Sequence, residues 1–132
     1  MSLQQYKSVS VKSINNIKKY LEESKNKKAF KILDKLIKRN PSNDETWLYL
    51  GITKRRLGDL NGAIECFQKA SNINISMLEA WGLLTITLID QGNIKMAQQI
   101  IEKAHYLNPY NANIHFFSKN LVRIYKKFGP FF

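Results

Sequence analysis

A period of 34 residues constrains this chain more than any single motif. Small and apolar residues recur at the same place in three successive stretches of sequence. The clearest sets are Ala29, Ala63 and Ala97; Leu33, Phe67 and Ile101; Leu36, Ala70 and Ala104; and Ser24, Gly58 and Gly92. A period of this length indicates a stack of small supersecondary units, none of which can bury its apolar face alone. Such stacks generally form binding surfaces.

Within each unit the apolar residues follow the period of a helix and not that of a strand. The second half of the first unit carries apolar side chains at i, i+3, i+4 and i+7, the spacing of an amphipathic helix. This stripe consists of Ala29, Ile32, Leu33, Leu36 and Ile37. Equivalent stripes predict helices at residues 10–23, 27–39, 44–57, 60–73, 78–91, 94–107 and 112–127.

Short polar breaks separate the two helices of each unit. Gly58 and Gly92 supply the positive φ angle that ends a helix, and Asp59 and Asn93 are suited to cap the helix that follows. The first unit has Ser24 at this place, which is a weaker stop signal. The expected fold is therefore an all-α solenoid of three antiparallel helix pairs with a capping helix after them.

The predicted domain occupies residues 10–127. Its units are residues 10–43, 44–77 and 78–111, and its capping helix is residues 112–127. Residues 1–9 form an N-terminal extension, and residues 128–132 form an apolar tail. We expect the phenylalanines of this tail to dock on the last helix pair or on another molecule, because burial of a phenylalanine is favourable by about 1.5–3 kcal/mol. The alternative is that the chain is cut from a longer protein and that the tail has lost its partner.

The second unit resembles the tetratricopeptide repeat (TPR), whose helix pair places conserved small and aromatic residues at these spacings. The matching residues are Trp47, Leu50, Gly51, Gly58, Ala63, Phe67 and Ala70. The third unit matches at Trp81, Leu84, Gly92, Ala97, Ala104 and Pro109, and it departs at Thr85 and Ile101. The first unit keeps Tyr20, Ala29 and Pro41, but has Ile17 where glycine is expected. We expect both tryptophans to pack in the core, and Leu57 and Tyr106 to make core or inter-repeat contacts.

The resemblance implies that the first helix of each pair lines a concave groove that binds a peptide or a partner helix. The candidate groove residues are Lys18, Leu48, Tyr49, Ile52, Arg55, Arg56, Leu83, Ile86, Phe117 and Asn120. An exposed apolar patch rimmed by charges is typical of an interaction site. The alternative for any one of these residues is that it only packs neighbouring helices together.

Some TPR proteins bind the acidic C-terminal tail of chaperones through basic and amide side chains in this groove. At the corresponding positions this chain has Ile14, Lys18, Tyr49, Glu79 and Leu83. Only Lys18 is basic, and Glu79 would repel a carboxylate. The sequence therefore argues against binding of a chaperone tail, and the partner is predicted to be another protein or peptide.

The net charge of +11 is concentrated at the two ends of the chain. Residues 1–43 carry 11 Lys/Arg and 3 Asp/Glu, which gives +8, and residues 112–132 carry four Lys/Arg and no acidic residue. A basic stripe of Lys28, Lys31, Lys35 and Lys38 lies on one face of the second predicted helix. This stripe is either a solvated outer face or a site for RNA or another anionic partner. Self-association of the repeats is a third alternative function.

No catalytic constellation is recognisable in the sequence. His105 and His115 lie on different predicted helices without a further ligand at metal-binding spacing, so we expect neither a metal site nor a cofactor. Cys66, the single cysteine, excludes an internal disulfide and fits a reducing compartment. No apolar run reaches the ~18 residues of a membrane span. The sequence thus predicts a non-enzymatic, cytoplasmic scaffold or adaptor.

Overall fold

The computed structural model describes residues 14–115, 119–120 and 123, and all the regular structure among them is helical. Five helices are complete: α2 (Asn26–Arg39), α3 (Asp44–Arg56), α4 (Leu60–Ile73), α5 (Leu78–Asp90) and α6 (Ile94–Leu107). Residues 14–22 belong to a first helix, and residues 112–115, 119–120 and 123 are helical after α6. The bounds of the complete helices agree with the predicted ones to within one residue. The predicted extension 1–9 and tail 128–132 lie outside the described residues.

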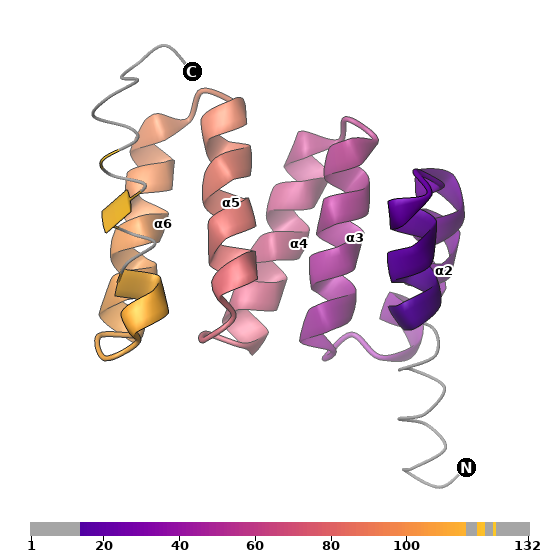
Figure 1. The fold of residues 1–132 in the computed structure, drawn as a ribbon, viewed down its shortest axis with the longest axis horizontal. Helices are drawn as coiled ribbons and strands as arrows, with labels where there is room; N and C mark the ends of the chain where they lie inside the picture. Colours follow the sequence, from indigo (N-terminus) through magenta and orange to yellow (C-terminus); the bar gives the residue numbers. More distant parts are fainter. Residues whose placement is uncertain (1–13, 116–118, 121–122, 124–132) are drawn as a thin grey trace, which may run out of the picture.

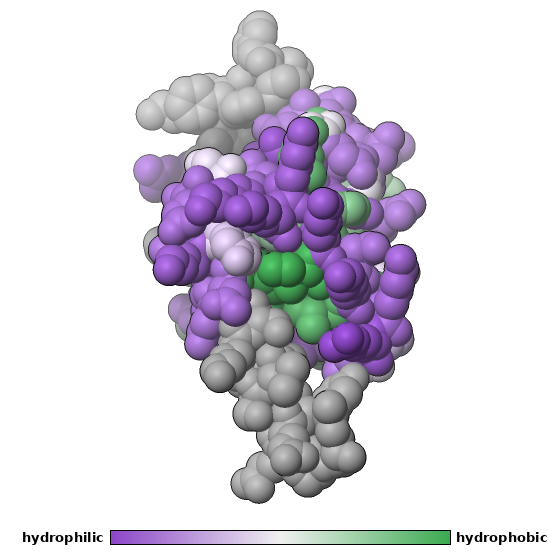
Figure 2. All heavy atoms as spheres, turned by 90° about the vertical axis from the view of Figure 1, so that its right-hand side faces the viewer, coloured by the Kyte–Doolittle hydropathy of each residue, from purple (hydrophilic) through white to green (hydrophobic). Residues whose placement is uncertain are grey.

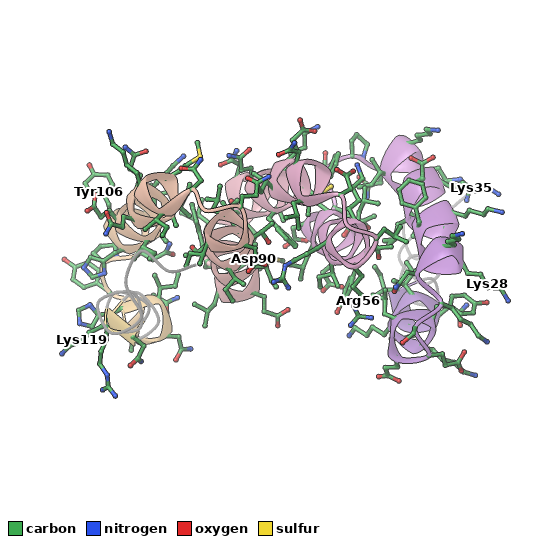
Figure 3. The ribbon with its side chains drawn as sticks, turned by 90° about the horizontal axis from the view of Figure 1, so that it is seen from above. Lys28, Lys35, Arg56, Asp90, Tyr106 and Lys119 are labelled. Atoms are coloured by element: carbon green, nitrogen blue, oxygen red, sulfur yellow. The ribbon has the colours of Figure 1, made fainter. Side chains whose placement is uncertain are left out.

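The helices stack in the order in which they occur in the chain (Figure 1). Helix α3 packs against α2 and α4, and α5 packs against α4 and α6. Seen from above, α2, α4 and α6 lie on one side of the stack, while α3 and α5 lie on the other (Figure 3). On the side of α3 and α5, the first helix and the helical residues after α6 project beyond these two helices at either end of the stack (Figure 3). This side of the stack is therefore concave. The predicted solenoid of antiparallel helix pairs is confirmed.

Positive φ angles end the first helix of each pair. Gly58 has φ of 88° and Gly92 has φ of 79°, and a Cβ atom at either position would meet nothing within 4 Å. Glycine is therefore needed there for its backbone conformation and not for space. Ser24, at the same place in the first unit, has φ of 58°. The next helix of that unit also has no side-chain cap, whereas Asp59 accepts a hydrogen bond from the Gly62 amide.

Replacing Ser24 with glycine is expected to raise the free energy of unfolding by up to about 1 kcal/mol. The left-handed conformation costs an L-residue about 1–2 kcal/mol, and the larger backbone entropy of glycine in the unfolded chain offsets part of the gain. Urea denaturation measures the change. The matched substitution Gly58→Ser should lower stability by a similar amount, and a Ser24→Gly variant less stable than the wild type would contradict the argument.

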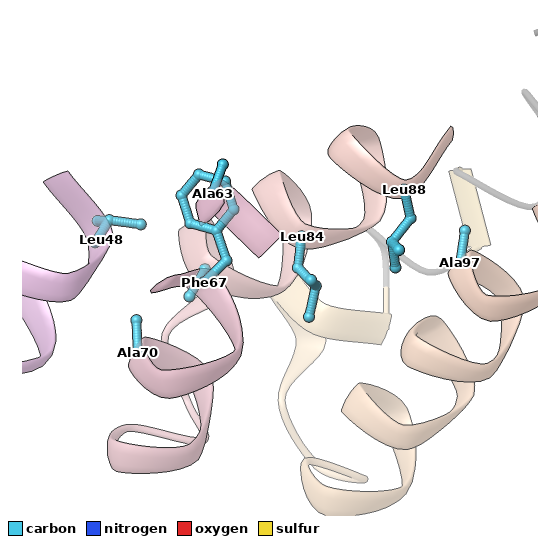
Figure 4. Close-up of a cluster of buried hydrophobic side chains, with 8 residues drawn as sticks. Leu48, Ala63, Phe67, Ala70, Leu84, Leu88 and Ala97 are labelled. Carbon is cyan, nitrogen blue, oxygen red and sulfur yellow. The ribbon is translucent and has the colours of Figure 1, made fainter. Parts of the chain in front are cut away.

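The core is built where small residues let the helices approach closely (Figure 4). Ala29, Ala63 and Ala97 are buried at 0, 0 and 2% exposure. The central cluster consists of Leu48, Ala63, Phe67, Ala70, Ala80, Leu84, Leu88 and Ala97. A Cβ atom added at Gly51 would lie 2.5 Å from Cε1 of the Phe67 ring. Helices α3 and α4 therefore approach closely only because residue 51 has no side chain.

The two tryptophans hold the loops that join successive units. Trp47 Nε1 donates a hydrogen bond to the Pro41 carbonyl at 2.6 Å, and Trp81 Nε1 donates to the Ile75 carbonyl at 2.7 Å. Trp81 is fully buried, as predicted. Trp47 is half-buried, and Lys69 Nζ lies 4.4 Å from its ring centroid.

The core alternative for Leu57 and Tyr106 is wrong, since their exposed fractions are 44% and 82%. Leu57 instead lines a pocket together with residues 24–28 of the first unit, which fits the inter-repeat alternative. Leu57 follows the end of α3, outside its packed stripe. Tyr106 lies about 200° around α6 from the buried Ala104, and so points away from α5.

Candidate interaction surface on the concave face

An apolar strip crosses the concave face from α3 to α5. It consists of Tyr49, Ile52, Leu83 and Ile86, which we call the concave strip. Ile52 and Leu83 pack against the central buried cluster, and Ile86 is 38% exposed. Arg56 and Asp90 are seen on the concave side in Figure 3. They follow Tyr49 and Leu83 by seven residues, which is about two helical turns, so the strip lies on the same helix faces. Two successive units thus present apolar side chains to the same surface.

The cations predicted for this face are engaged within the chain. Arg55 Nη2 lies 2.5 Å from Asp90 Oδ2, and Arg56 Nη1 donates a hydrogen bond to the Leu21 carbonyl at 2.7 Å. Lys18 Nζ lies 5.8 Å from the centroid of the Tyr49 ring. The Arg55–Asp90 pair is partly exposed, so it is worth at most about 1 kcal/mol. Its main effect is to join the ends of α3 and α5.

These contacts determine which ligand chemistry the concave strip favours. A ligand carboxylate would have to compete with Asp90 for Arg55 and with the Leu21 carbonyl for Arg56. Half-exposed aliphatic and aromatic side chains, in contrast, gain about 25 cal/mol for each Å² of apolar surface that a ligand covers. The geometry therefore favours a ligand with apolar anchors over an acidic one.

The structure corrects one predicted groove residue and does not describe another. Leu48 is 3% exposed and belongs to the central cluster, so its side chain is unavailable to a partner. Its burial follows from the position of α3, which packs against α2, α4 and α5 and is therefore covered on several sides. Phe117 lies outside the described residues. Asn120 is half-buried on the helical segment after α6.

Sequence reasoning missed the way in which successive units are linked across this face. The Arg55–Asp90 and Arg56–Leu21 contacts both join residues 35 positions apart, one repeat plus one residue. Opposite charges at this spacing were a detectable signal for the first contact. No sequence signal marks the second, because its acceptor is a backbone carbonyl.

The other reactive side chains that the structure describes form no recognisable site. The rings of His105 and His115 do meet, with centroids 5.0 Å apart, although they come from different helices. Among the described residues, no group of three or more His, Cys, Asp or Glu is placed to hold a metal ion. Cys66 is buried, and burial raises the pKa of its thiol to about 11. The thiol is therefore protonated near neutral pH and is a poor nucleophile.

The predicted basic stripe lies on the outer side of α2. Lys28, Lys31, Lys35 and Lys38 are all exposed, and Lys38 pairs with Asp34 at 3.1 Å. Lys28 and Lys35 point away from the rest of the stack (Figure 3). A pocket of about 410 Å³ next to the stripe is lined by residues 24–28 and Leu57. The basic charge is therefore separate from the concave strip.

Within the part of the chain that the structure describes, no helix has the length and apolarity needed to cross a membrane. The family model of the tetratricopeptide repeat matches residues 44–74, which is nearly the whole second unit. No curated protein sequence is significantly similar to the chain.

Several solved structures share the fold. The type III secretion chaperone SycD of Yersinia enterocolitica, in complex with a peptide of the translocator YopD, has a TM-score of 0.78 and 14% identity, over 91% of this chain and 92% of that one. The TPR domain of Sgt2 from Aspergillus fumigatus has a TM-score of 0.72 and 16% identity, over 89% and 80% of the two chains. The TPR2B domain of yeast Sti1, in a complex with pHsp70, has a TM-score of 0.69 and 16% identity, over 83% and 95%. The chain therefore has the all-α solenoid fold of the tetratricopeptide-repeat family, with one repeat also matched in its sequence at residues 44–74.

Proposed function

We propose that this protein is a non-enzymatic interaction module, a scaffold or adaptor that holds a peptide or a partner helix on its concave face. The observation that carries the proposal is the concave strip, because Tyr49, Ile52, Leu83 and Ile86 present apolar surface on two adjacent helices. Contiguous exposed apolar surface with a polar rim is typical of a protein-binding site. An amphipathic helix or an extended segment with apolar side chains at regular spacing would fit such a strip.

The similar structures support this class of function. SycD forms a complex with a peptide of the translocator YopD, and the Sti1 domain forms a complex with pHsp70, so the same fold binds another protein or a peptide in both. Specificity for an acidic chaperone tail is not part of our proposal. Glu79 is exposed, and Leu83 stands where a basic residue would be required. We also propose a cytoplasmic location, which a single buried and reduced cysteine supports.

Substitution of the concave strip should abolish capture of the partner. We expect Tyr49→Ala combined with Ile86→Asp to lower the amount of partner recovered from a lysate of the source cell by at least about tenfold. The change removes an aromatic contact and places a charge where an apolar anchor would be desolvated. Affinity purification with quantitative mass spectrometry measures the recovery, and circular dichroism checks that the variant is folded.

A matched control lies on the outer helix α6. Tyr106→Ala combined with Met96→Asp makes the same chemical changes at exposed residues, since Met96 is 39% exposed and Ile86 is 38% exposed. This outer variant should recover the partner as the wild type does. If the folded concave variant recovers the same partners as the wild type, the concave face is not the binding site.

A further inference from the structure

The end of the stack at α2 carries apolar side chains between hydrophilic ones (Figure 2). Tyr20 of the first helix and Ile32 and Leu36 of α2 are half-buried and pack against the core cluster of the first unit. The exposed lysines Lys28, Lys31 and Lys35 lie on the same helix as Ile32 and Leu36. We call these six residues the N-terminal end face.

The 34-residue register shows which kind of surface this end presents. In the second unit, Leu50 and Cys66 are 4% and 1% exposed, and both belong to the same buried cluster as Leu33 of the first unit. These positions are therefore covered by the preceding helix pair. The equivalent of Cys66 in the first unit is Ile32, which is half-buried. Ile32 of the N-terminal end face thus occupies a position that, one unit later, packs against the preceding helices. Glu65 and Lys69, the equivalents of Lys31 and Lys35, stay exposed.

The charge of this face restricts the helices that can cover it. None of the salt bridges among the described residues involves Lys28, Lys31 or Lys35. The acidic residue of α2, Asp34, is paired with Lys38. Three cations spaced three and four residues apart therefore lie beside Ile32 and Leu36, and no described carboxylate forms an ion pair with them. Carboxylates on a covering helix would complete these pairs.

We propose that the N-terminal end face docks an acidic amphipathic helix of another protein. The apolar side chains of that helix cover Ile32 and Leu36, and its flanking carboxylates meet Lys31 and Lys35. A second copy of this chain is the wrong partner electrostatically, because residues 1–43 carry +8 and residues 112–132 carry +4. A nucleic acid would neutralise the lysines, but its phosphate backbone would leave the aliphatic surface uncovered.

The test uses a synthetic helical peptide with a stripe of leucines flanked by glutamates, labelled with fluorescein. Fluorescence anisotropy should show saturable binding of this peptide to the full chain. Lys31→Glu combined with Lys35→Glu should weaken binding by at least about tenfold, and Ile32→Ser should weaken it as well. The control Lys95→Glu with Lys103→Glu makes the same charge change at exposed residues of α6, and it should bind like the wild type.

Two further comparisons distinguish the N-terminal end face from the concave strip and from a general affinity for charged ligands. The concave variant Tyr49→Ala with Ile86→Asp should bind the acidic peptide with unchanged affinity, so the two proposals can fail independently. A peptide in which lysine replaces every glutamate should not bind. The proposal is overturned if the Lys31/Lys35 variant binds the acidic peptide as tightly as the wild type. It is equally overturned if polyuridylate or phosphatidylserine vesicles bind through these lysines and the peptide does not.

Discussion

Replacing Trp81 with alanine is expected to lower the free energy of unfolding by about 3–5 kcal/mol. The side chain is 1% exposed and packs with Ala104 and Ile114, so its removal leaves a large cavity between the third unit and the helix after it. Natural domains are stable by only about 5–15 kcal/mol, so the variant should be close to unfolded at physiological temperature. Chemical denaturation followed by circular dichroism measures the loss.

Two comparisons separate the packing of the Trp81 ring from its hydrogen bond. Trp47 occupies the same register position and makes the same kind of bond, but it is half-buried, so Trp47→Ala should cost less than Trp81→Ala. Trp81→Phe should be mild, because the Ile75 carbonyl keeps a hydrogen bond from Asn108 Nδ2 at 2.8 Å. Equal losses for the two alanine variants would show that burial does not determine the cost.

Gly51→Ile should cost at least about 3 kcal/mol, the upper end of the range for overpacked cores. Even a Cβ atom at this position would lie 2.5 Å from the Phe67 ring, and isoleucine adds three further carbons. The better helix propensity of isoleucine recovers only a few tenths of a kcal/mol, which does not offset this overlap. Thermal denaturation should therefore show a large fall in Tm.

The first unit shows how this substitution can be compensated. It has Ile17 and Leu33 at the positions of Gly51 and Phe67, and both residues are 0% exposed in one cluster. The double variant Gly51→Ile with Phe67→Leu recreates this pair, so it should be clearly more stable than Gly51→Ile alone. A double-mutant cycle gives the coupling energy. If the losses of unfolding free energy caused by Gly51→Ile and Phe67→Leu simply add in the double variant, the smaller side chain at position 67 does not compensate for the larger one at position 51.

The helices were predictable because their limits depend on local chemistry. Gly58 and Gly92 adopt positive φ angles, and Asp59 and Asn93 cap the next helices, all within a few residues of sequence. The alanines at the helix crossings repeat with the same 34-residue period and are buried, as their small size indicated. Local signals of this kind are independent of how the units are oriented.

The candidate site was less predictable because it depends on how one unit packs on the next. Leu48 and Tyr49 are adjacent in sequence, yet Leu48 is buried and Tyr49 is half-buried. Hydrophobic periodicity does not separate them, because α3 is covered on several sides. The bond from Arg56 to the Leu21 carbonyl likewise requires the relative position of two units, which no residue pattern within one unit encodes.

The hydrogen bonds between units also determine how the stack responds to a mechanical force. Gln91 bonds to Asn61 and Asn108 bonds to the Ile75 carbonyl, so both bonds connect the third unit to the second. Asn74 bonds to Asp44 within the second unit. The main packing contacts among the complete helices likewise join neighbours in the chain, or α3 and α5. The curvature of the stack is therefore the sum of the small rotations of each unit relative to the next, at the joints between units. We therefore expect a partner wider than the resting curve to be accommodated by small rotations at several joints, with the core of each unit left intact.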